Sequence, residues 1–555
     1  KEEMTFMDTF WVLSSPDPVE RTNAAQCLLV HCFPHLDADA DDESTTPTQP
    51  VEDCAYALKR LLDGVCSGRA SARQGFGSAL TGFLGMLASV ESKEIVGTFQ
   101  KLYGNKDETD METDDGETWI RAELLRRTAP QSTGTDGGAH APSRKKSVEE
   151  RDCALGRLFG ILAVARSGML KETNKNISSL QCEFAKDIVA LYEKFTLKSN
   201  AQLRDLCCYT LLEYVTIVGH KQITLQEMYD AVLEPFVSDW FVAESTDTDE
   251  NQPTSNRVRM EKLSLVLYLH TRLSNDSLKT KYDAVLKKLV SIAPQIVKQL
   301  VMEQSTEDSP ADSTAPNLVW NQLVPYFHKR LTNTNQQHDE KEMTQCTTQM
   351  AEFWKECMAS LYQQTTNKNT ALTSITSATN TLLNTLLSFV SIKSGKQYVY
   401  DALDIRGILT FCNDILTRPA PKTKQTKEVS NTQQQAQTVL SKIVALSSNT
   451  QLLMKECLIL SPHFVKNVTS TKGTSTNTMA YTKGMKDFAC SSSYLEFLKE
   501  QIINCQDTNH VTSGLLHRQY LRTVLCHNSF DGIPWSTKAV ATQLLMLVVA
   551  ENDQR

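Results

Sequence analysis

The chain has 555 residues and a formal net charge of -8 at pH 7, and it is longer than the roughly 250 to 300 residues at which a single core stops growing. It must therefore divide into domains or extend as an array of repeats. The acidic balance excludes a generic nucleic-acid coat, because binding to phosphates needs clustered lysine and arginine.

The cysteines and the apolar runs exclude further classes of protein. Fifteen cysteines occur without a CxxC pair and without a secretory signal, so we expect small buried hydrophobes and neither a disulfide framework nor a zinc ribbon. The longest apolar run, 544–550, is far shorter than the ~18 residues of a membrane span. We therefore expect a soluble intracellular protein without membrane contact. The chain begins at Lys1, which predicts a fragment of something longer.

Helical repeats are predicted over 1–104, interrupted by an acidic loop at 37–50. Six apolar residues recur here at steps of four, three, one, three and four, which places them on one stripe of a helix. They are Ala72, Phe76, Ala79, Leu80, Phe83 and Leu87. Glycine and proline are scarce along the whole chain, which also favours helix.

An acidic and polar linker is predicted at 105–147, because its composition is typical of solvated segments. Near its end lie Arg144, Lys145 and Lys146, a candidate nuclear import signal. So short a basic run also arises by chance.

A second block of helical repeats is predicted at 148–302, with an acidic loop at 244–256. Residues 154–165 are apolar nearly all round apart from Arg157, as expected for a helix enclosed by neighbours. Gly168 suits the position just after its C-terminus.

A linker at 303–316 precedes a third block of helical repeats at 317–555, which contains a polar loop at 419–437. Helical stretches joined in pairs at roughly 40-residue spacing are typical of HEAT or armadillo arrays. We therefore predict an all-α fold, an armadillo/HEAT-like helical-repeat solenoid with acidic disordered loops. A multi-domain helical-bundle protein stays open as the alternative.

Two carboxylates one residue apart, Asp247 and Asp249, resemble the way in which a polymerase holds two divalent metals. Polymerase carboxylates lie on a hairpin flanked by apolar strands, whereas these lie in the polar run ESTDTDENQ, which is typical of a solvated loop. Asp110, Asp114 and Asp115 lie in the same kind of context. We predict no metal site and no catalytic site from these residues.

A zinc cluster of Cys27, His31, Cys32 and His35 is the second candidate, because residues four apart share a helical face. Pro34 is expected to end the helix before His35, and the segment also has the character of a buried helix, which we favour. Cys526 and His527 are adjacent, so on a helix they point in different directions and do not form a nucleophile and base. No phosphate-binding loop, dinucleotide fingerprint, GxSxG or HExxH motif occurs.

Basic residues form only small clusters. The candidate contacts with a partner or nucleic acid are Lys59, Arg60, Arg69 and Arg73. An ordinary solvated surface is the alternative for all four.

Three segments resemble a known family, in the same order along the chain. They are 10–29 (FWVLSSPDPVERTNAAQCLL), 54–84 (CAYALKRLLDGVCSGRASARQGFGSALTGFL) and 148–170 (VEERDCALGRLFGILAVARSGML). They resemble the N-terminal region of the DNA polymerase V family, also called DNA polymerase phi, which includes the nucleolar Myb-binding proteins. Beyond about residue 220 only LVWNQL at 318–323 and FWK at 353–355 are similar to later family landmarks.

The resemblance implies a nuclear, mainly nucleolar protein with an armadillo-like fold, involved in ribosomal RNA gene transcription and ribosome biogenesis. The implied partners are nucleolar and pre-ribosomal proteins and transcription factors, with rDNA or pre-rRNA as an open question. No cofactor and no small-molecule substrate are implied. Family members run on into acidic and then strongly basic C-terminal segments, which this sequence lacks, so we expect protein partners for this stretch.

We predict a non-enzymatic scaffold. A template-directed DNA polymerase, as the family name suggests, and a general HEAT-repeat adaptor or transport receptor are the alternatives. In the segment SARQGFGSALTGFL, Ala72, Gly75 and Ala79 keep side chains small where a neighbouring helix would approach. Arg73 and Arg157 are expected to order carboxylates or carbonyls between repeats, and facing a partner is the alternative.

Overall fold

The computed structural model describes most of the first 405 residues. The described ranges are 4–34, 50–89, 93–103, 118–129, 144–171, 175–195, 197–242, 257–273, 279–303, 315–336, 340–366, 372–391 and 396–405, with scattered positions up to 443. The predicted loops at 37–50, 244–256 and 419–437 and the linker at 303–316 lie wholly or largely outside these ranges. The same holds for most of the third block of repeats beyond residue 405.

Two compact units divide the chain, Lys1–Val266 (unit 1) and Leu267–Arg555 (unit 2). The division falls within the block that we predicted at 148–302. It runs through a helix, α12 (Met260–Arg272), and not through a polar segment, so composition does not mark it. Composition marks a boundary only where the chain between two units is a solvated linker.

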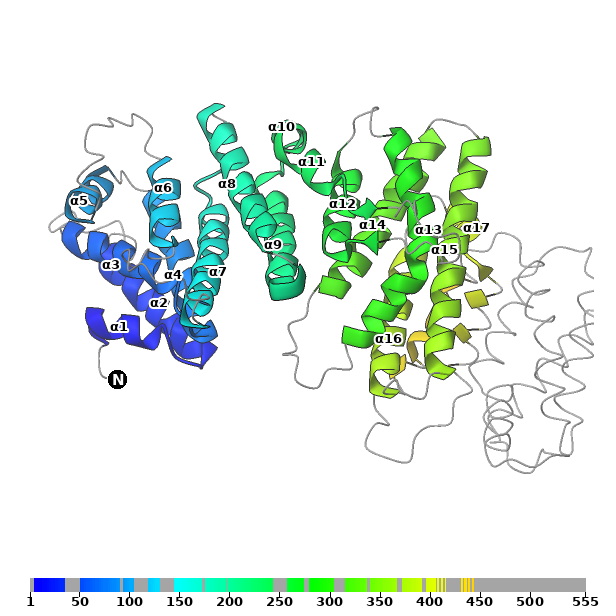
Figure 1. The fold of residues 1–555 in the computed structure, drawn as a ribbon, viewed down its shortest axis with the longest axis horizontal. Helices are drawn as coiled ribbons and strands as arrows, with labels where there is room; N and C mark the ends of the chain where they lie inside the picture. Colours follow the sequence, from blue (N-terminus) through cyan, green and yellow to red (C-terminus); the bar gives the residue numbers. More distant parts are fainter. Residues whose placement is uncertain are drawn as a thin grey trace, which may run out of the picture. The chain divides into compact units, whose positions relative to one another are not determined.

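Unit 1 consists of helices that pack on one another in layers (Figure 1). They are α1 (Phe6–Val12), α2 (Pro18–Cys32), α3 (Val51–Gly64), α4 (Ala70–Ser89), α5 (Lys93–Tyr103), α6 (Thr118–Arg127), α7 (Arg144–Ser167), α8 (Lys175–Lys194), α9 (Leu197–Val218), α10 (Gln222–Met228) and α11 (Glu234–Val237). A π-helical turn, Tyr229–Leu233, joins the last two. In this unit α4 packs against α2, α3 and α7, and α7 packs in turn against α9.

The predicted apolar stripe of α4 is confirmed, because all six of its residues are buried. The close approach predicted at Gly75 is also confirmed. A Cβ atom there would lie 1.9 Å from the carbonyl oxygen of Leu13, so only glycine lets α4 pass so close to the end of α1. Gly168 follows α7 with a φ of +89°, the left-handed conformation that glycine adopts without strain.

One element lies where a linker was predicted. Residues 118–127, inside the range 105–147, form the helix α6, and α7 already begins at Arg144. The acidic residues on one side and the polar residues on the other set the average composition of this range, which hid a ten-residue helix held by contacts with distant residues. Residues 105–117 and 130–143 lie outside the described part.

The described part of unit 2 is also helical. Its helices are α13 (Lys279–Glu303), α14 (Ala315–Gln336), α15 (Glu340–Thr366), α16 (Leu372–Val390) and α17 (Lys396–Asp401). Phe327, Phe353, Trp354 and Phe389 meet in its core, with ring centroids 5.5–5.8 Å apart. Such an aromatic cluster buries much apolar surface and fixes the packing of α14, α15 and α16.

The prediction of an all-α helical-repeat fold is confirmed. The only strand pairing in the described ranges is β1 (Phe241–Val242) with β2 (Arg257–Val258), which are two residues each and antiparallel. No described helix combines the length and the apolar character needed to cross a membrane.

Candidate functional site

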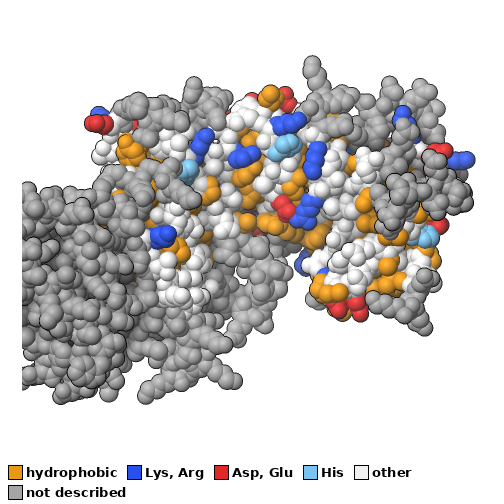
Figure 2. All heavy atoms as spheres, turned by 180° about the vertical axis from the view of Figure 1, so that it is seen from behind, with side chains coloured by type: hydrophobic (Ala, Val, Ile, Leu, Met, Phe, Trp, Pro, Cys, Tyr) orange, Lys and Arg blue, Asp and Glu red, His pale blue; other side chains and the backbone are white. Residues whose placement is uncertain are grey.

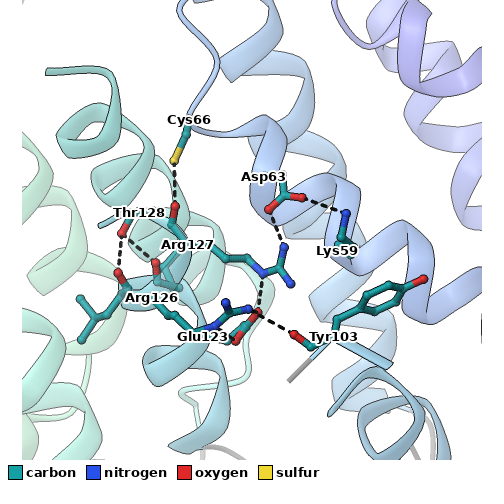
Figure 3. A network of polar contacts seen from close by, with 10 residues as sticks. Lys59, Asp63, Cys66, Tyr103, Glu123, Arg126, Arg127 and Thr128 are labelled. Atoms are coloured by element: carbon teal, nitrogen blue, oxygen red, sulfur yellow. Dashed lines mark hydrogen bonds and ion pairs between the residues drawn. The ribbon is translucent and has the colours of Figure 1, made fainter. Parts of the chain in front are cut away.

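A network of charged side chains fastens α6 to α3 (Figure 3). Glu123, of which 8% is exposed, accepts hydrogen bonds from the guanidinium groups of both Arg126 and Arg127. Arg127 also reaches Asp63 of α3, 2.5 Å away, and Asp63 lies 3.5 Å from the ammonium group of Lys59. Glu123 thus orients the two arginines within α6, and the ion pair between Arg127 and Asp63 fastens the end of α6 to α3.

The first half of α6 is fastened to α8. Arg121 donates two hydrogen bonds to Asp187, at 2.7 and 2.8 Å, and lies 3.3 Å from Glu183. The hydrogen bonds with Asp187 raise the pKa of Arg121 above its ordinary value. This two-bond geometry sets direction as well as attraction between the two helices.

Two arginines from the segments that resemble the family make hydrogen bonds within unit 1. Arg73 of α4 donates to the carbonyl oxygen of Ser67 at 2.5 Å and to Asp152 of α7 at 3.3 Å. Arg157 of α7 donates to the hydroxyl of Thr128 at 3.0 Å. Burial lowers the pKa of both guanidinium groups. As expected, Arg73 orders a carboxylate of another helix and a carbonyl. Within the described ranges Arg157 binds only Thr128, through its hydroxyl and, at 3.5 Å, its carbonyl oxygen.

The four basic residues predicted as contacts do not form one surface. Lys59 lies 5.6 Å from the ring of Tyr103, and Arg60 lies 5.7 Å from the ring of Phe10, so they face different neighbours. Arg73 faces α7 and keeps 11% of its side chain exposed, whereas Arg69 is exposed in the turn before α4. A contact of these residues with a partner stays a prediction.

The candidate import signal occupies a different position from the one predicted. Arg144, Lys145 and Lys146 form the first turn of α7 and do not lie in a linker. Their side chains lie outside the described part, and their role as a signal stays a prediction.

The candidate zinc residues in the described part do not form a cluster of ligands. Cys32 is buried, and its carbonyl accepts a hydrogen bond from the thiol of Cys54 at 3.2 Å. His31 instead lies 3.0 Å from Asp53. Cys27 is exposed, so the expectation that it is buried is wrong, because it lies on the outer face of α2.

The remaining candidates for metal chemistry lie elsewhere. Within the described ranges no group of three or more potential ligands is found. His35, Cys526 and His527 fall outside these ranges, as do the two carboxylates at 247 and 249 and those at 110, 114 and 115.

One feature of unit 1 escaped the sequence analysis. Trp11 of α1 exposes 75% of its side chain, and Met7, one turn before it, exposes 51%. The helix is only seven residues long, which is too short for its apolar period to separate an outer from an inner face. The sequence did contain one indication of this exposed pair, namely two large apolar residues four positions apart beside the buried Phe10.

Comparisons with known proteins give one family and distant structural likenesses. The family model described as DNA polymerase phi matches residues 56–390. No curated protein matches the chain. Among solved structures, a "circular tandem repeat protein with novel repeat topology and enhanced subunit contact surfaces" matches with a TM-score of 0.25 and 10% identity, over 99% of this chain and 97% of that one.

A crystal structure of SYS-1 matches with a TM-score of 0.19 and 10% identity, over 98% of this chain and 99% of that one. The family model covers more than half of the sequence and includes the helices α4 to α16, which belong to both units. The chain belongs to the DNA polymerase phi family.

Proposed function

We propose that this chain is a non-enzymatic nucleolar scaffold in ribosome biogenesis and ribosomal RNA gene transcription. It binds nucleolar and pre-ribosomal proteins and transcription factors, and rDNA or pre-rRNA are further ligands to test. Membership of the DNA polymerase phi family supports a nuclear location, and a helical-repeat fold supports a role in binding other proteins.

The observation that carries the proposal is the use of charge within the family-matched part. Arg73, Arg121 and Arg127 are each paired with carboxylates that belong to another helix of the unit. These groups align helices with one another, as a scaffold requires. A catalytic centre would instead direct several polar groups towards one reacting atom.

Affinity purification from nuclear extract tests the proposal. The full chain, tagged, is expected to enrich pre-ribosomal proteins and factors of ribosomal RNA gene transcription over a tagged helical-repeat protein of similar charge. Recovery of cytoplasmic partners alone would contradict the proposal. Binding of nuclear-import cargo without nucleolar staining would favour a transport receptor.

Primer extension with Mg²⁺ tests the competing polymerase function, which the family description and the pair Asp247 and Asp249 suggest. We expect no extension from the purified chain. Extension that is lost in the double variant Asp247→Ala, Asp249→Ala would overturn the non-enzymatic proposal. Extension that survives this change would exclude this pair as the site but would still contradict the proposal once contaminating polymerases were removed.

A further inference from the structure

Exposed large hydrophobic side chains concentrate on the first two helices of unit 1 and just before them. Eight such side chains occur in the described ranges, and five of them lie between residues 4 and 30. We call these five the N-terminal apolar surface: Met4 (36% exposed), Met7 (51%), Trp11 (75%), Val19 (64%) and Val30 (50%). Single exposed apolar residues are ordinary, whereas a concentration of them marks an interaction site.

The helix that carries Met7 and Trp11, α1, is firmly attached to the unit. Phe10, on the inner face of α1, has its ring centroid 5.4 Å from that of Phe6 and 5.9 Å from that of Tyr56 on α3. The hydroxyl of Thr5 caps the start of the helix by accepting from the N–H of Asp8. Met7 and Trp11 lie four residues apart and so share the outer face. Trp11 is therefore displayed on an ordered support.

The charged groups that accompany this surface are acidic. Asp8 lies on α1, and Asp17 and Glu20 lie at the start of α2; each accepts a hydrogen bond from a neutral donor. The nearby Arg21 is already engaged within the unit, since it donates to the carbonyl oxygens of Ser15 and Pro16 at 2.8 and 2.9 Å. Figure 2 shows hydrophobic and acidic side chains next to one another over the N-terminal helices, at lower right.

We propose that the N-terminal apolar surface binds an amphipathic helix of a protein partner that carries basic residues beside its apolar face. This inference rests on the proposed scaffold function and names one of its docking sites. A displayed tryptophan is the residue type that most often dominates binding energy. The carboxylates beside it would pair with lysine or arginine on the edges of an incoming helix.

Asp8, Asp17 and Glu20 form an acidic rim beside the N-terminal apolar surface. This rim disfavours two other occupants. A symmetric contact with a second copy would bring the same carboxylates towards one another, because a two-fold interface pairs a patch with itself. Nucleic acid would place phosphates against these carboxylates. A basic helix avoids both repulsions.

A designed peptide tests the proposal on the full chain. The probe is a labelled 18-residue helix of leucine and lysine, with leucine at the helical period, and its partner is the same peptide with glutamate in place of lysine. Fluorescence anisotropy measures the affinity of each. We expect the lysine peptide to bind at least about tenfold more tightly than the glutamate peptide, because only the former complements the rim.

Variants locate the binding. Trp11→Ala is expected to weaken the lysine peptide about 30-fold, which is about 2 kcal/mol. The matched control is Ile223→Ala on α10, since Ile223 is 76% exposed and lies outside the surface; it should change the affinity less than about twofold. Far-ultraviolet circular dichroism and thermal melting confirm that both variants fold.

Three results would overturn the proposal. The first is equal affinity of the Trp11→Ala and Ile223→Ala variants, which means general attraction to an acidic protein. The second is the absence of peptide binding, which would leave the recovery of nuclear partners, and with it the scaffold function, to be judged separately. The third is self-association of the chain that Trp11→Ala abolishes, measured by sedimentation, because it assigns the surface to a second copy.

Discussion

At the scale of single residues, the ion pair between α6 and α8 is the contact whose loss is easiest to measure. Replacing Asp187 by Asn removes the charge that meets Arg121 while keeping the size of the side chain, of which 13% is exposed. We expect the free energy of unfolding to fall by about 1.5 kcal/mol, between the values for exposed and for fully buried pairs. Chemical denaturation checks this.

The control for that change lies one residue before it. Lys186 pairs with Glu183 at 2.7 Å, but about half of its side chain is exposed. Removing this lysine with Lys186→Ala should leave the denaturation midpoint where it is. Equal losses in the two variants would mean that burial does not decide the strength of these pairs.

The thiols offer a second measurement at this scale. Burial raises the pKa of Cys66 and of Cys207 to about 12, and alkylation requires the thiolate. The exposed Cys27 should therefore react with iodoacetamide well before these two, as peptide mass spectrometry can follow. Labelling of Cys66 as fast as Cys27 in the folded chain would contradict this order.

The same pKa shifts give a direction for stability against pH. A thiol whose pKa is raised on folding stays protonated in the folded chain, while the unfolded chain loses that proton above about pH 9. Cys66 and Cys207 thus contribute stability that is complete below pH 9 and declines as the pH rises towards 12. Replacing both by alanine should flatten the alkaline loss of stability, which thermal melts between pH 8 and about pH 11 would reveal.

At the scale of helices, the approach of α4 to the end of α1 depends on the missing side chain of Gly75. An added Cβ would meet the carbonyl of Leu13 at 1.9 Å, and backbone atoms must move to relieve it. Gly75→Ala is expected to destabilise unit 1 by about 2 kcal/mol, as overpacking does. Gly97→Ala on α5, where nothing lies within 4 Å, should instead stabilise by about 0.5–1 kcal/mol. Thermal melting of both variants decides, and a stabilising Gly75→Ala would refute the close contact.

Helices could be predicted from the sequence only where the spacing of their apolar residues, or the residues at their ends, identified them locally. The stripe of α4 and the glycine after α7 are local, so both were predicted. The helix α6 was missed because its placement depends on Asp63 and Asp187, which lie far away in sequence. The four basic residues from 59 to 73 were grouped by closeness in sequence, but the rotation of α3 and α4 sends their side chains to different neighbours.

At the scale of the molecule, the net charge and the ion pairs of the arginines lead us to expect protein partners and not nucleic acids. The chain carries a net charge of -8, and several arginines of unit 1 are already bound to carboxylates of the same unit. Release of counterions from phosphates, the main source of affinity for nucleic acids, needs cations that are free to reach them. Few of these arginines can supply it.

We therefore expect the partners captured from nuclear extract to be held by protein contacts. Treatment with ribonuclease should leave most of them bound, and raising the salt from about 50 to 200 mM should weaken capture much less than the 10³-fold or greater loss of a protein with many phosphate contacts.

A tagged basic RNA-binding domain is the control, since its RNA-tethered partners should be released. If ribonuclease removed most partners of this chain too, RNA would be the bridging ligand. The variant Arg69→Glu, which changes an exposed cation without breaking an ion pair in the described ranges, would then show whether the turn before α4 makes that contact.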